Sequence, residues 1–311
     1  MLRKTWKPRL AKSAWRAASR IQALLMVTGL GRIQRLDVLR EQAKKRILRG
    51  LQSGELLLLE AGGYPIYVFN RPHFHGVYLR QSYETYTVQL FQDAVRPGAT
   101  VLDLGANIGY FSLVAAEKAG AQGSVYAFEP GPENLEVLKR NIEINGFTNI
   151  RVVPKAVGEE SKTVMLHLAA DSDQHSLFVP PMVGTKGTIS VECIALDDFL
   201  DGVTPDVVKM DIEGNELRAL DGMRETVAMS KSLVMFVELN PVCLRGAQAQ
   251  ARDLVLRLRD LGFELGFIDE DARAVGPVTD DYLRAIERRP PGWFANLYCT
   301  KGLPNPRSGR A

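Results

Sequence analysis

From Thr100 onward, short apolar runs alternate with amphipathic segments, and this rhythm constrains the fold more than any other feature of the chain. Helices are predicted between most of the apolar runs, at Ile108–Lys118, Pro132–Asn145, Asn215–Met223 and Ala247–Leu261. The runs themselves predict strands at Thr100–Leu104, Ser124–Phe128, Ile150–Val153, Val207–Met210, Leu233–Glu238, Phe263–Ile268 and Phe294–Cys299. Apolar strands separated by amphipathic helices form a mainly parallel sheet covered on both faces. The sequence therefore predicts an α/β fold with a doubly wound, mostly parallel sheet.

Two stretches depart from this rhythm. Residues 160–195 contain two β-like runs, Thr163–Leu168 and Thr188–Ile194, around a polar loop, which predicts a β-hairpin inserted beside the working edge of the sheet. Ahead of Thr100, strands are predicted at Pro65–Asn70 and Gly76–Gln81 and a helix at Tyr83–Val95. We expect four parts: a basic helical extension at 1–60, a small α/β lead-in at 61–99, the main domain at 100–302 and a disordered tail at 303–311.

Charge is distributed unevenly between these parts. Residues 1–50 hold 14 basic and two acidic residues, a charge of +12, whereas the other 261 residues carry −9, and the total is +3. Such asymmetry is typical of contact with a nucleic acid or a membrane. Three interpretations of residues 1–50 stay open. We expect first a solvated helix pair packed on the body or on a second subunit, as in a homo-oligomer. An amphipathic helix on an anionic membrane comes next, and a nucleic-acid arm after it.

Cysteine usage and the N-terminal apolar stretch bear on localisation. The three cysteines lie 50 and 56 residues apart without a C-x-x-C motif, which excludes a disulfide scaffold and fits a reducing compartment. Ile21–Leu30 is too short to span a bilayer, which takes about 20 apolar residues. We expect a soluble, cytoplasmic protein, with peripheral membrane association as an alternative.

The first predicted strand runs into the loop Asp103-Leu-Gly105-Ala-Asn107-Ile-Gly109, which opens a helix. Ligands of open α/β sheets bind at the carboxyl ends of the strands, where a helix start offers unpaired N–H groups. Glu129 ends the second strand, where an acid can accept hydrogen bonds from ribose hydroxyls. A dinucleotide fingerprint would need glycines at Asn107 and Tyr110. The loop therefore favours a nucleoside joined to an amino acid over NAD.

Four blocks in this order resemble the FkbM family of S-adenosylmethionine-dependent methyltransferases: Asp103–Gly109, Ala127–Pro130, Ala195–Phe199 and Val208–Gly214. The resemblance runs from about Tyr83 to Asp269 and leaves residues 1–60 uncovered. It implies a class I Rossmann-like fold with a seven-stranded sheet and an antiparallel final pair. It also implies S-adenosylmethionine as cofactor and a hydroxyl group of a sugar, glycolipid or natural product as acceptor.

The resemblance further implies which residues contact the cofactor. Asp103, Gly105, Asn107 and Gly109 would hold its methionine end, and Glu129 would bind its ribose. Ala156, just past the third strand, lies where the adenine pocket is expected, although a neighbour could make the contact.

Three charged residues, Lys209, Asp211 and Glu213, recur every second position at the end of the fourth strand. An extended chain puts such residues on one side. We expect Asp211 and Glu213 to line the methyl-transfer site, one as a general base or metal ligand, with Lys209 orienting it. The alternative is that both acids cap the helix that begins at Asn215. Glu238 is a weaker candidate, and a divalent metal stays open.

Other polar residues and other functions compete with this interpretation. The pair His73 and His75 is more typical of surface histidines than of a metal site, and His175-Ser176 lies in the inserted loop that could cover the acceptor. With the basic segment, the core would also suit an RNA or DNA ribose methyltransferase. A non-catalytic, cofactor-binding scaffold is the third alternative. We expect an O-methyltransferase acting on a small-molecule or glycan hydroxyl.

Overall fold

The computed structural model describes residues 56–70, 84–169, 174–178, 185–290 and 292–303. These residues form two compact units, one made of 56–70 with 140–146 and the other of the remaining described residues. The basic segment 1–50, the predicted strand Gly76–Gln81, the pair His73 and His75, and all but the first residue of the predicted tail lie outside the described residues.

The first unit is a β-hairpin completed by the end of a helix. Strands β1 (Leu56–Ala61) and β2 (Tyr64–Phe69) pair antiparallel across Gly62 and Gly63, whose φ angles of 57° and 92° suit a tight hairpin turn. Asn141, buried in helix α6 (Pro132–Asn145), accepts from Tyr67 N at 2.6 Å and donates to Tyr67 O at 3.0 Å. Residues 56–60, which the sequence analysis assigned to the N-terminal extension, are part of β1 and pair with β2.

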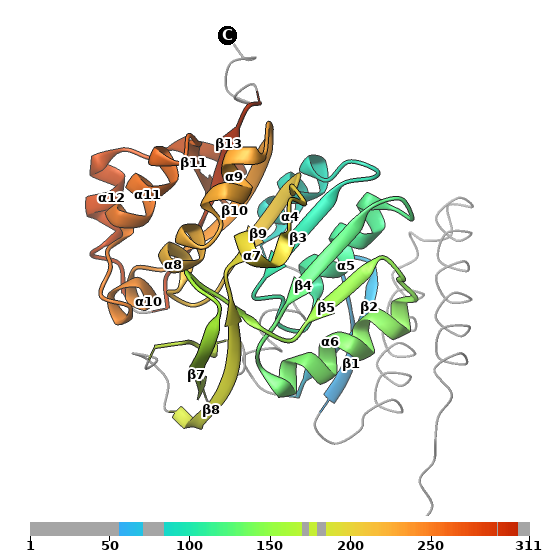
Figure 1. The fold of residues 1–311 in the computed structure, drawn as a ribbon. Coiled ribbons are helices and arrows are strands. Elements are labelled where there is room, and N and C mark those ends of the chain that lie inside the picture. The colour runs from blue at the N-terminus through green and yellow to red at the C-terminus, as the bar shows by residue number, and fades with distance from the viewer. Residues whose placement is uncertain (1–55, 71–83, 170–173, 179–184, 291, 304–311) are drawn as a thin grey trace, which may run out of the picture. The chain divides into compact units, whose positions relative to one another are not determined.

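The second unit is built on a sheet of eight strands, in the order β12-β11-β13-β10-β9-β3-β4-β5 (Figure 1). The strands from β10 to β5 are parallel, and β13 is antiparallel to both of its neighbours. The strands are β3 (Thr100–Leu104), β4 (Ser124–Phe128), β5 (Ile150–Val153), β9 (Val207–Met210), β10 (Leu233–Leu239), β11 (Glu264–Asp269), β12 (Ala274–Pro277) and β13 (Ala295–Lys301). The predicted class I fold is confirmed. The eighth strand, β12, was not expected and extends the edge as a hairpin with β11.

Helices cover both faces of this sheet (Figure 1). Helices α4 (Thr85–Ala94) and α5 (Tyr110–Ala119) pack on one face. The opposite face of the sheet is covered by α7 (Leu196–Leu200), α8 (Glu216–Asp221), α9 (Arg224–Met229), α10 (Pro241–Gly246), α11 (Ala251–Asp260) and α12 (Asp280–Ile286). The predicted helix Asn215–Met223 corresponds to α8, and the predicted helix Ala247–Leu261 corresponds to α11, which begins only at Ala251 because Gln248 has a φ of 63°. Helices α9 and α10 were not predicted.

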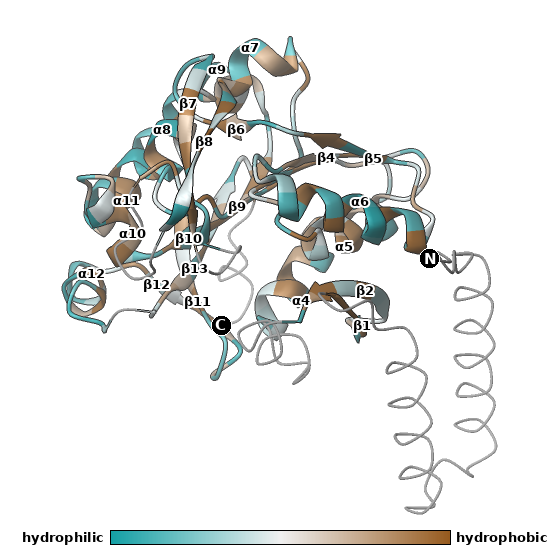
Figure 2. Cartoon of the chain, turned by 90° about the horizontal axis from the view of Figure 1, so that it is seen from below, coloured by the Kyte–Doolittle hydropathy of each residue, from teal (hydrophilic) through white to brown (hydrophobic). Residues whose placement is uncertain are grey.

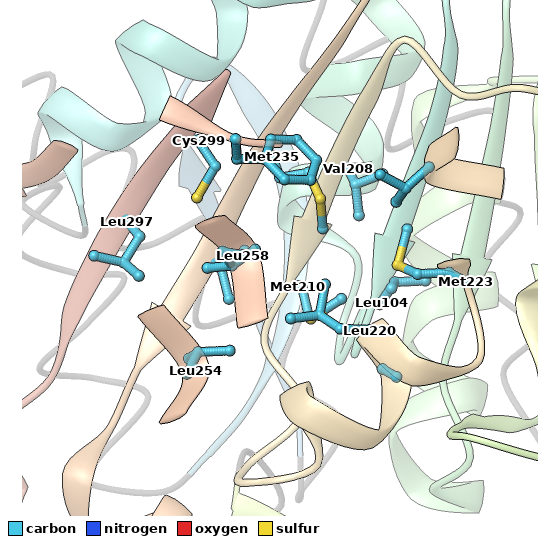
Figure 3. Packing of buried hydrophobic residues seen from close by; sticks show 14 of the residues in the cluster. Leu104, Val208, Met210, Leu220, Met223, Met235, Leu254, Leu258, Leu297 and Cys299 are labelled. Carbon is cyan, nitrogen blue, oxygen red and sulfur yellow. The ribbon is translucent and has the colours of Figure 1, made fainter. Parts of the chain in front are cut away.

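Successive residues of each strand point to opposite faces of the sheet, and Figure 2 shows hydrophobic colouring along much of this sheet. Leu104, Met210 and Met235 point to one face, where they pack against Leu220 of α8 and Leu258 of α11 (Figure 3). The intervening residues of the same strands face α4 and α5. That second face carries the buried polar residues Asp103, Lys209, Glu238 and Asn296, and it therefore holds the candidate site.

The predicted insertion is a hairpin of β7 (Lys162–Ala169) and β8 (Thr185–Ile194), joined by the short strand β6 (Ala156–Val157) into a separate three-stranded sheet. Residues 174–178 of its connecting loop are described. Within the described part of the chain, every helix is too short or too polar to cross a bilayer.

Candidate active site

The loop after β3 packs directly on the loop after β9. Gly105 has a φ of 82°, and a Cβ placed there would lie 1.8 Å from the backbone carbonyl oxygen of Asp211. Only glycine allows this approach, because it tolerates positive φ and has no side chain. The predicted cofactor loop and the predicted catalytic strand end are therefore in contact through their backbones.

Asn107 and Gly109 give this loop its left-handed turns. Their φ angles are 51° and 94°, and Gly109 is the residue that precedes helix α5. A Cβ on Gly109 would come within 2.4 Å of Leu138 Cδ1. Asn107 Oδ1 is buried and has no hydrogen-bond partner among the described residues. An unpaired buried acceptor is costly, so a donor from a ligand would stabilise this position.

Glu129 follows β4 and is 4% exposed. Its Oε2 accepts from Asn107 N at 2.9 Å, and its Oε1 accepts from Gly131 N at 2.8 Å and from Asn134 Nδ2 at 3.3 Å. Burial raises the pKa of Glu129 to about 7, although these hydrogen bonds act in the opposite direction. The structure thus brings Glu129 to the predicted loop, where it holds Asn107 in its turn.

Asp103 is buried on β3 and accepts a hydrogen bond from the hydroxyl of Ser112 in α5. Burial raises the pKa of Asp103 to about 6, against the effects of Ser112 and Lys209. Asp103 is the register partner of Lys209 on β9, so their side chains emerge on the same face of the sheet.

Lys209 is 1% exposed and is the centre of a charged network. Its Nζ lies 3.3 Å from Asp211 Oδ2 and 3.4 Å from Asn296 Oδ1, and 5.2 Å from the ring centroid of Phe111. Burial lowers the pKa of Lys209, but the carboxylates of Asp211 and Glu84 outweigh burial and raise it overall. The predicted contact between Lys209 and Asp211 is present.

Glu213 reaches the site by a turn rather than along an extended strand. Strand β9 ends at Met210, and Glu213 has a φ of 52°. Its Oε2 accepts from Cys243 Sγ at 3.0 Å. The buried Glu216 Oε1 accepts hydrogen bonds from the backbone N–H groups of Ile212 and Gly214, each at 3.2 Å. The alternative interpretation expected Asp211 and Glu213 to cap this helix. Glu216 instead accepts the hydrogen bonds from the backbone N–H groups that precede it.

Glu238, at the end of β10, is 6% exposed and belongs to the same cluster. Carboxylate oxygens of Asp211, Glu213 and Glu238 all lie within 4.8 Å of one another. Burial raises the pKa of Glu238 well above its usual value, and the carboxylates of Asp211 and Glu213 add to the effect. Glu238, which the sequence indicated only as a weaker candidate, therefore lies in one cluster with Asp211 and Glu213.

Two further polar residues of the site were missed in the sequence. Glu84, which precedes α4 with a φ of 42°, is 6% exposed, and burial raises its pKa to about 7 while Lys209 opposes this shift. Asn296 on β13 is the register partner of Glu238. Alternation along β13 would have found Asn296, since it lies between apolar residues, but no local pattern marks Glu84.

The inserted loop reaches both ends of the site. Ser176 Oγ donates to the Glu213 backbone carbonyl at 2.7 Å. A Cβ on Gly131 would lie 2.8 Å from Glu129 Oε1 and 2.9 Å from His175 Cδ2, so His175 lies beside Glu129. Ala156 is buried on β6, three residues beyond the end of β5, and its predicted contact with adenine stays a prediction.

Comparison with known proteins places this site in a family. The model of the methyltransferase FkbM domain matches residues 103–265, which begin at Asp103 and include every acid of the cluster. The chain belongs to the FkbM methyltransferase family. Among curated relatives of this FkbM protein, the hexuronic acid methyltransferase AglP of Haloferax volcanii is 28% identical over 163 residues, 49% of this chain and 61% of that protein.

A second relative, methyltransferase sdnD of Sordaria araneosa, is 27% identical over 157 residues, 40% of this chain and 60% of that protein. The FkbM chain thus spans about six tenths of the length of both relatives. Among solved structures, methyltransferase FkbM from Methylobacillus flagellatus KT is similar with a TM-score of 0.41 and 19% identity, covering 68% of this chain and 50% of that one.

Proposed function

We propose that this FkbM protein is an S-adenosylmethionine-dependent O-methyltransferase that acts on a hydroxyl of a sugar, a glycolipid or a natural product. The observation that carries the proposal is the contact of Gly105 with the Asp211 carbonyl, which joins the family's cofactor loop to a carboxylate cluster. AglP, named as a hexuronic acid methyltransferase, supports a sugar acceptor.

The residues of the loop fit this cofactor. Asn107 Oδ1 is a buried acceptor without a partner among the described residues, and it suits the amino group of the methionine end. In the proposal, Asp103, Gly105 and Gly109 shape the same end, Glu129 accepts from the ribose hydroxyls, and Ala156 or a neighbour lies at the adenine. S-adenosylmethionine would supply an electrophilic methyl group on a sulfonium.

Asp211 and Glu213 are proposed to serve the acceptor. When the acceptor oxygen forms its bond to the methyl carbon, the carbon–sulfur bond breaks and the hydroxyl proton must leave. A carboxylate held at this position can take that proton. Lys209 holds Asp211 at 3.3 Å and would fix its orientation. Because the leaving group is good, alignment and exclusion of water would supply much of the acceleration.

A divalent cation is the other means by which carboxylates activate a hydroxyl, since a bound metal lowers the pKa of the oxygen it binds. The experiment that tests both is turnover of cofactor labelled in the methyl group, offered to fractionated cell extract with Mg²⁺ or with a chelator. Label in a glycan, glycolipid or small-molecule fraction supports the proposal. Label confined to RNA or DNA, or no transfer at all, contradicts it.

Asp211→Asn and Glu213→Gln test the assignment of roles. We expect each substitution to lower kcat by 10²–10⁴-fold, the usual contribution of general base catalysis, with cofactor affinity kept. Glu264→Gln, an exposed acid at the start of β11, is the matched control and should have normal turnover. If both site variants turn over as fast as the unchanged protein, neither acid acts in the reaction.

A further inference from the structure

The acids beyond β9 and β10 are arranged around a common point. Asp211 and Glu213 come from the turn after β9, and Glu238 comes from the end of β10, the neighbouring strand. One carboxylate oxygen of each lies within 4.8 Å of the others. Like charges at such distances repel strongly in a partly buried place, so a cation or a proton must offset them.

The state of Glu238 is the independent sign of a missing partner. Glu238 is only 6% exposed, and its Oε2 has no hydrogen-bond partner among the described residues. Buried carboxylate oxygens in native proteins are nearly always paired. The Glu238 carboxylate lies beside Asp211 and Glu213, which offer acceptors and no donor when ionised.

Charge counting favours a divalent partner. When all three carboxylates are ionised they carry −3, and the ammonium of Lys209, which lies 3.3 Å from Asp211 Oδ2, offsets at most one of these charges. Glu216, the other buried acid of the turn, accepts from the N–H groups of Ile212 and Gly214 and is not part of the cluster. A remainder of −2 matches one doubly charged cation.

The ligand atoms select among metals. Oxygen-only donors suit the hard cations Mg²⁺, Mn²⁺ and Ca²⁺ rather than zinc or copper. Two oxygens on one ion can lie at most twice the metal–oxygen distance apart, about 4.2 Å for Mg²⁺ and about 4.6–5.2 Å for Ca²⁺. The carboxylate oxygens lie within 4.8 Å of one another, which is inside the range for Ca²⁺ and slightly above the limit for Mg²⁺. The partly exposed Asp211 and Glu213 can move by the few tenths of an ångström that Mg²⁺ would require.

We infer that Asp211, Glu213 and Glu238 form a binding site for one divalent cation, coordinated through their carboxylate oxygens. The binding itself follows from the cluster alone, and its role of holding the acceptor hydroxyl rests on the proposed function. Cys243 Sγ, which donates to Glu213 Oε2 at 3.0 Å, would then position this ligand from the side of α10.

Titration of the full chain with Mn²⁺, followed by the electron paramagnetic resonance signal of the free ion, tests the site without any need for turnover. We expect one Mn²⁺ per chain, displaced by Mg²⁺ or Ca²⁺. Glu238→Gln and Glu213→Gln should each weaken the binding of Mn²⁺ at least tenfold. The Glu264→Gln protein should bind Mn²⁺ as tightly as the unchanged protein. Glu213 is partly exposed, so its variant keeps the test valid if Glu238→Gln does not fold.

Absence of Mn²⁺ binding at millimolar concentration, or an affinity of the Glu238→Gln and Glu213→Gln proteins equal to that of the unchanged protein, overturns the inference. Calorimetric titration with S-adenosylhomocysteine separates this failure from that of the proposed function. Cofactor binding and methyl transfer without Mn²⁺ binding would remove the metal site alone. Mn²⁺ binding without transfer to any hydroxyl would remove the proposed function and leave the metal site.

Discussion

Gly105 is the residue at which the cofactor loop and the acid cluster meet, so its substitution should affect both. In Gly105→Ala the new methyl group would lie 1.8 Å from the Asp211 carbonyl oxygen, at a φ of 82°. Since a backbone atom cannot yield as a flexible side chain does, we expect a loss of roughly 2–4 kcal/mol in the free energy of unfolding. Urea denaturation measures this loss, and calorimetry should show weaker cofactor binding.

Gly120→Ala is the matched control, because Gly120 also has a positive φ, of 66°, but nothing lies within 4 Å of an added Cβ. It should cost only the left-handed backbone strain, about 1–2 kcal/mol, with cofactor affinity unchanged. If the two variants lose the same stability and bind the cofactor equally, the close approach at Gly105 has no role in the site.

Lys209 holds together several acids that burial would otherwise neutralise. In Lys209→Met, Asp211, Glu84 and Glu238 lose their cation, so we expect a loss of about 3–5 kcal/mol near pH 8. The pKa values of Glu84 and Glu238 are raised in the folded state, so these two acids are increasingly protonated and need the cation less as pH falls, and the loss should shrink toward pH 5. Denaturation at pH 5 and pH 8 measures the difference.

The exposed Lys162 on β7 provides the comparison, because it pairs with Glu159 and Glu160 at the surface. Lys162→Met should leave the free energy of unfolding essentially unchanged at both pH values. A Lys209→Met protein as stable at pH 8 as at pH 5 would mean that the lysine does not offset the buried acids.

Glu129 gives the ligand-free protein a specific pH dependence. Its pKa is raised from 4.5 in the unfolded chain to about 7 in the fold, so the folded state holds the proton more tightly. Its contribution to stability is therefore complete below about pH 4.5 and is lost as pH rises toward 7. Glu129→Gln should remove this part of the slope, on the order of 1–3 kcal/mol, in denaturation curves between pH 4.5 and pH 7.5. An unchanged slope would show that Glu129 is ionised throughout.

The residues of the site differed in how visible they were in the sequence. Lys209 and Asp211 lie at the end of an apolar strand, so alternation indicated their common side, whereas Asp103 was indicated by the loop motif that it begins. The position of Glu213 depended on a left-handed turn that the alternating pattern does not encode. Glu84 enters the site from before α4, 125 residues ahead of Lys209, and only tertiary packing brings the two together.

At the scale of elements, α4 begins at a cap supplied by a distant hairpin. Glu270, in the β11–β12 turn, accepts from Tyr86 N at 2.8 Å, from Thr87 N at 2.9 Å and from Thr87 Oγ1 at 2.6 Å. Glu270→Ala should cost about 1–2 kcal/mol, the usual value of a helix cap, and speed amide hydrogen exchange in the first turn of α4. Asp271→Ala, one residue along and exposed, is expected to leave that exchange rate unchanged.

Strands were predicted more accurately than helices, for a physical reason. Strands β3 and β9 are buried almost throughout and largely apolar, with one charged residue each, so they form short apolar segments with clear ends. Helix ends depend on single backbone angles, such as that of Gln248 between α10 and α11. The short edge strand β12 has no apolar run, and its pairing with β11 is a tertiary effect.

At the scale of the whole molecule, the charge of +12 on residues 1–50 lies outside the matched family domain, so it is expected to affect location and assembly rather than chemistry. Deleting residues 1–50 changes the formal net charge from +3 to −9. We expect this deletion to abolish retention on heparin while keeping kcat for a soluble acceptor. Co-sedimentation of the full chain with anionic vesicles but not with neutral ones would identify a membrane as the partner. A fall in the number of chains per particle on deletion, measured by light scattering, would identify a second subunit. A heparin affinity that survives deletion contradicts the prediction.

Strand β13 lies between β10 and β11, although it follows both in the chain. Asn296, which it carries, reaches Lys209 from this position. Lys209 and the acids around it are therefore synthesised well before Asn296. Strands β10 and β11 are likewise synthesised before β13, the strand that pairs with both of them. A chain without β13 would therefore lack both the strand that separates β10 from β11 and the Asn296 contact of Lys209, so the sheet and the surroundings of Lys209 are completed last.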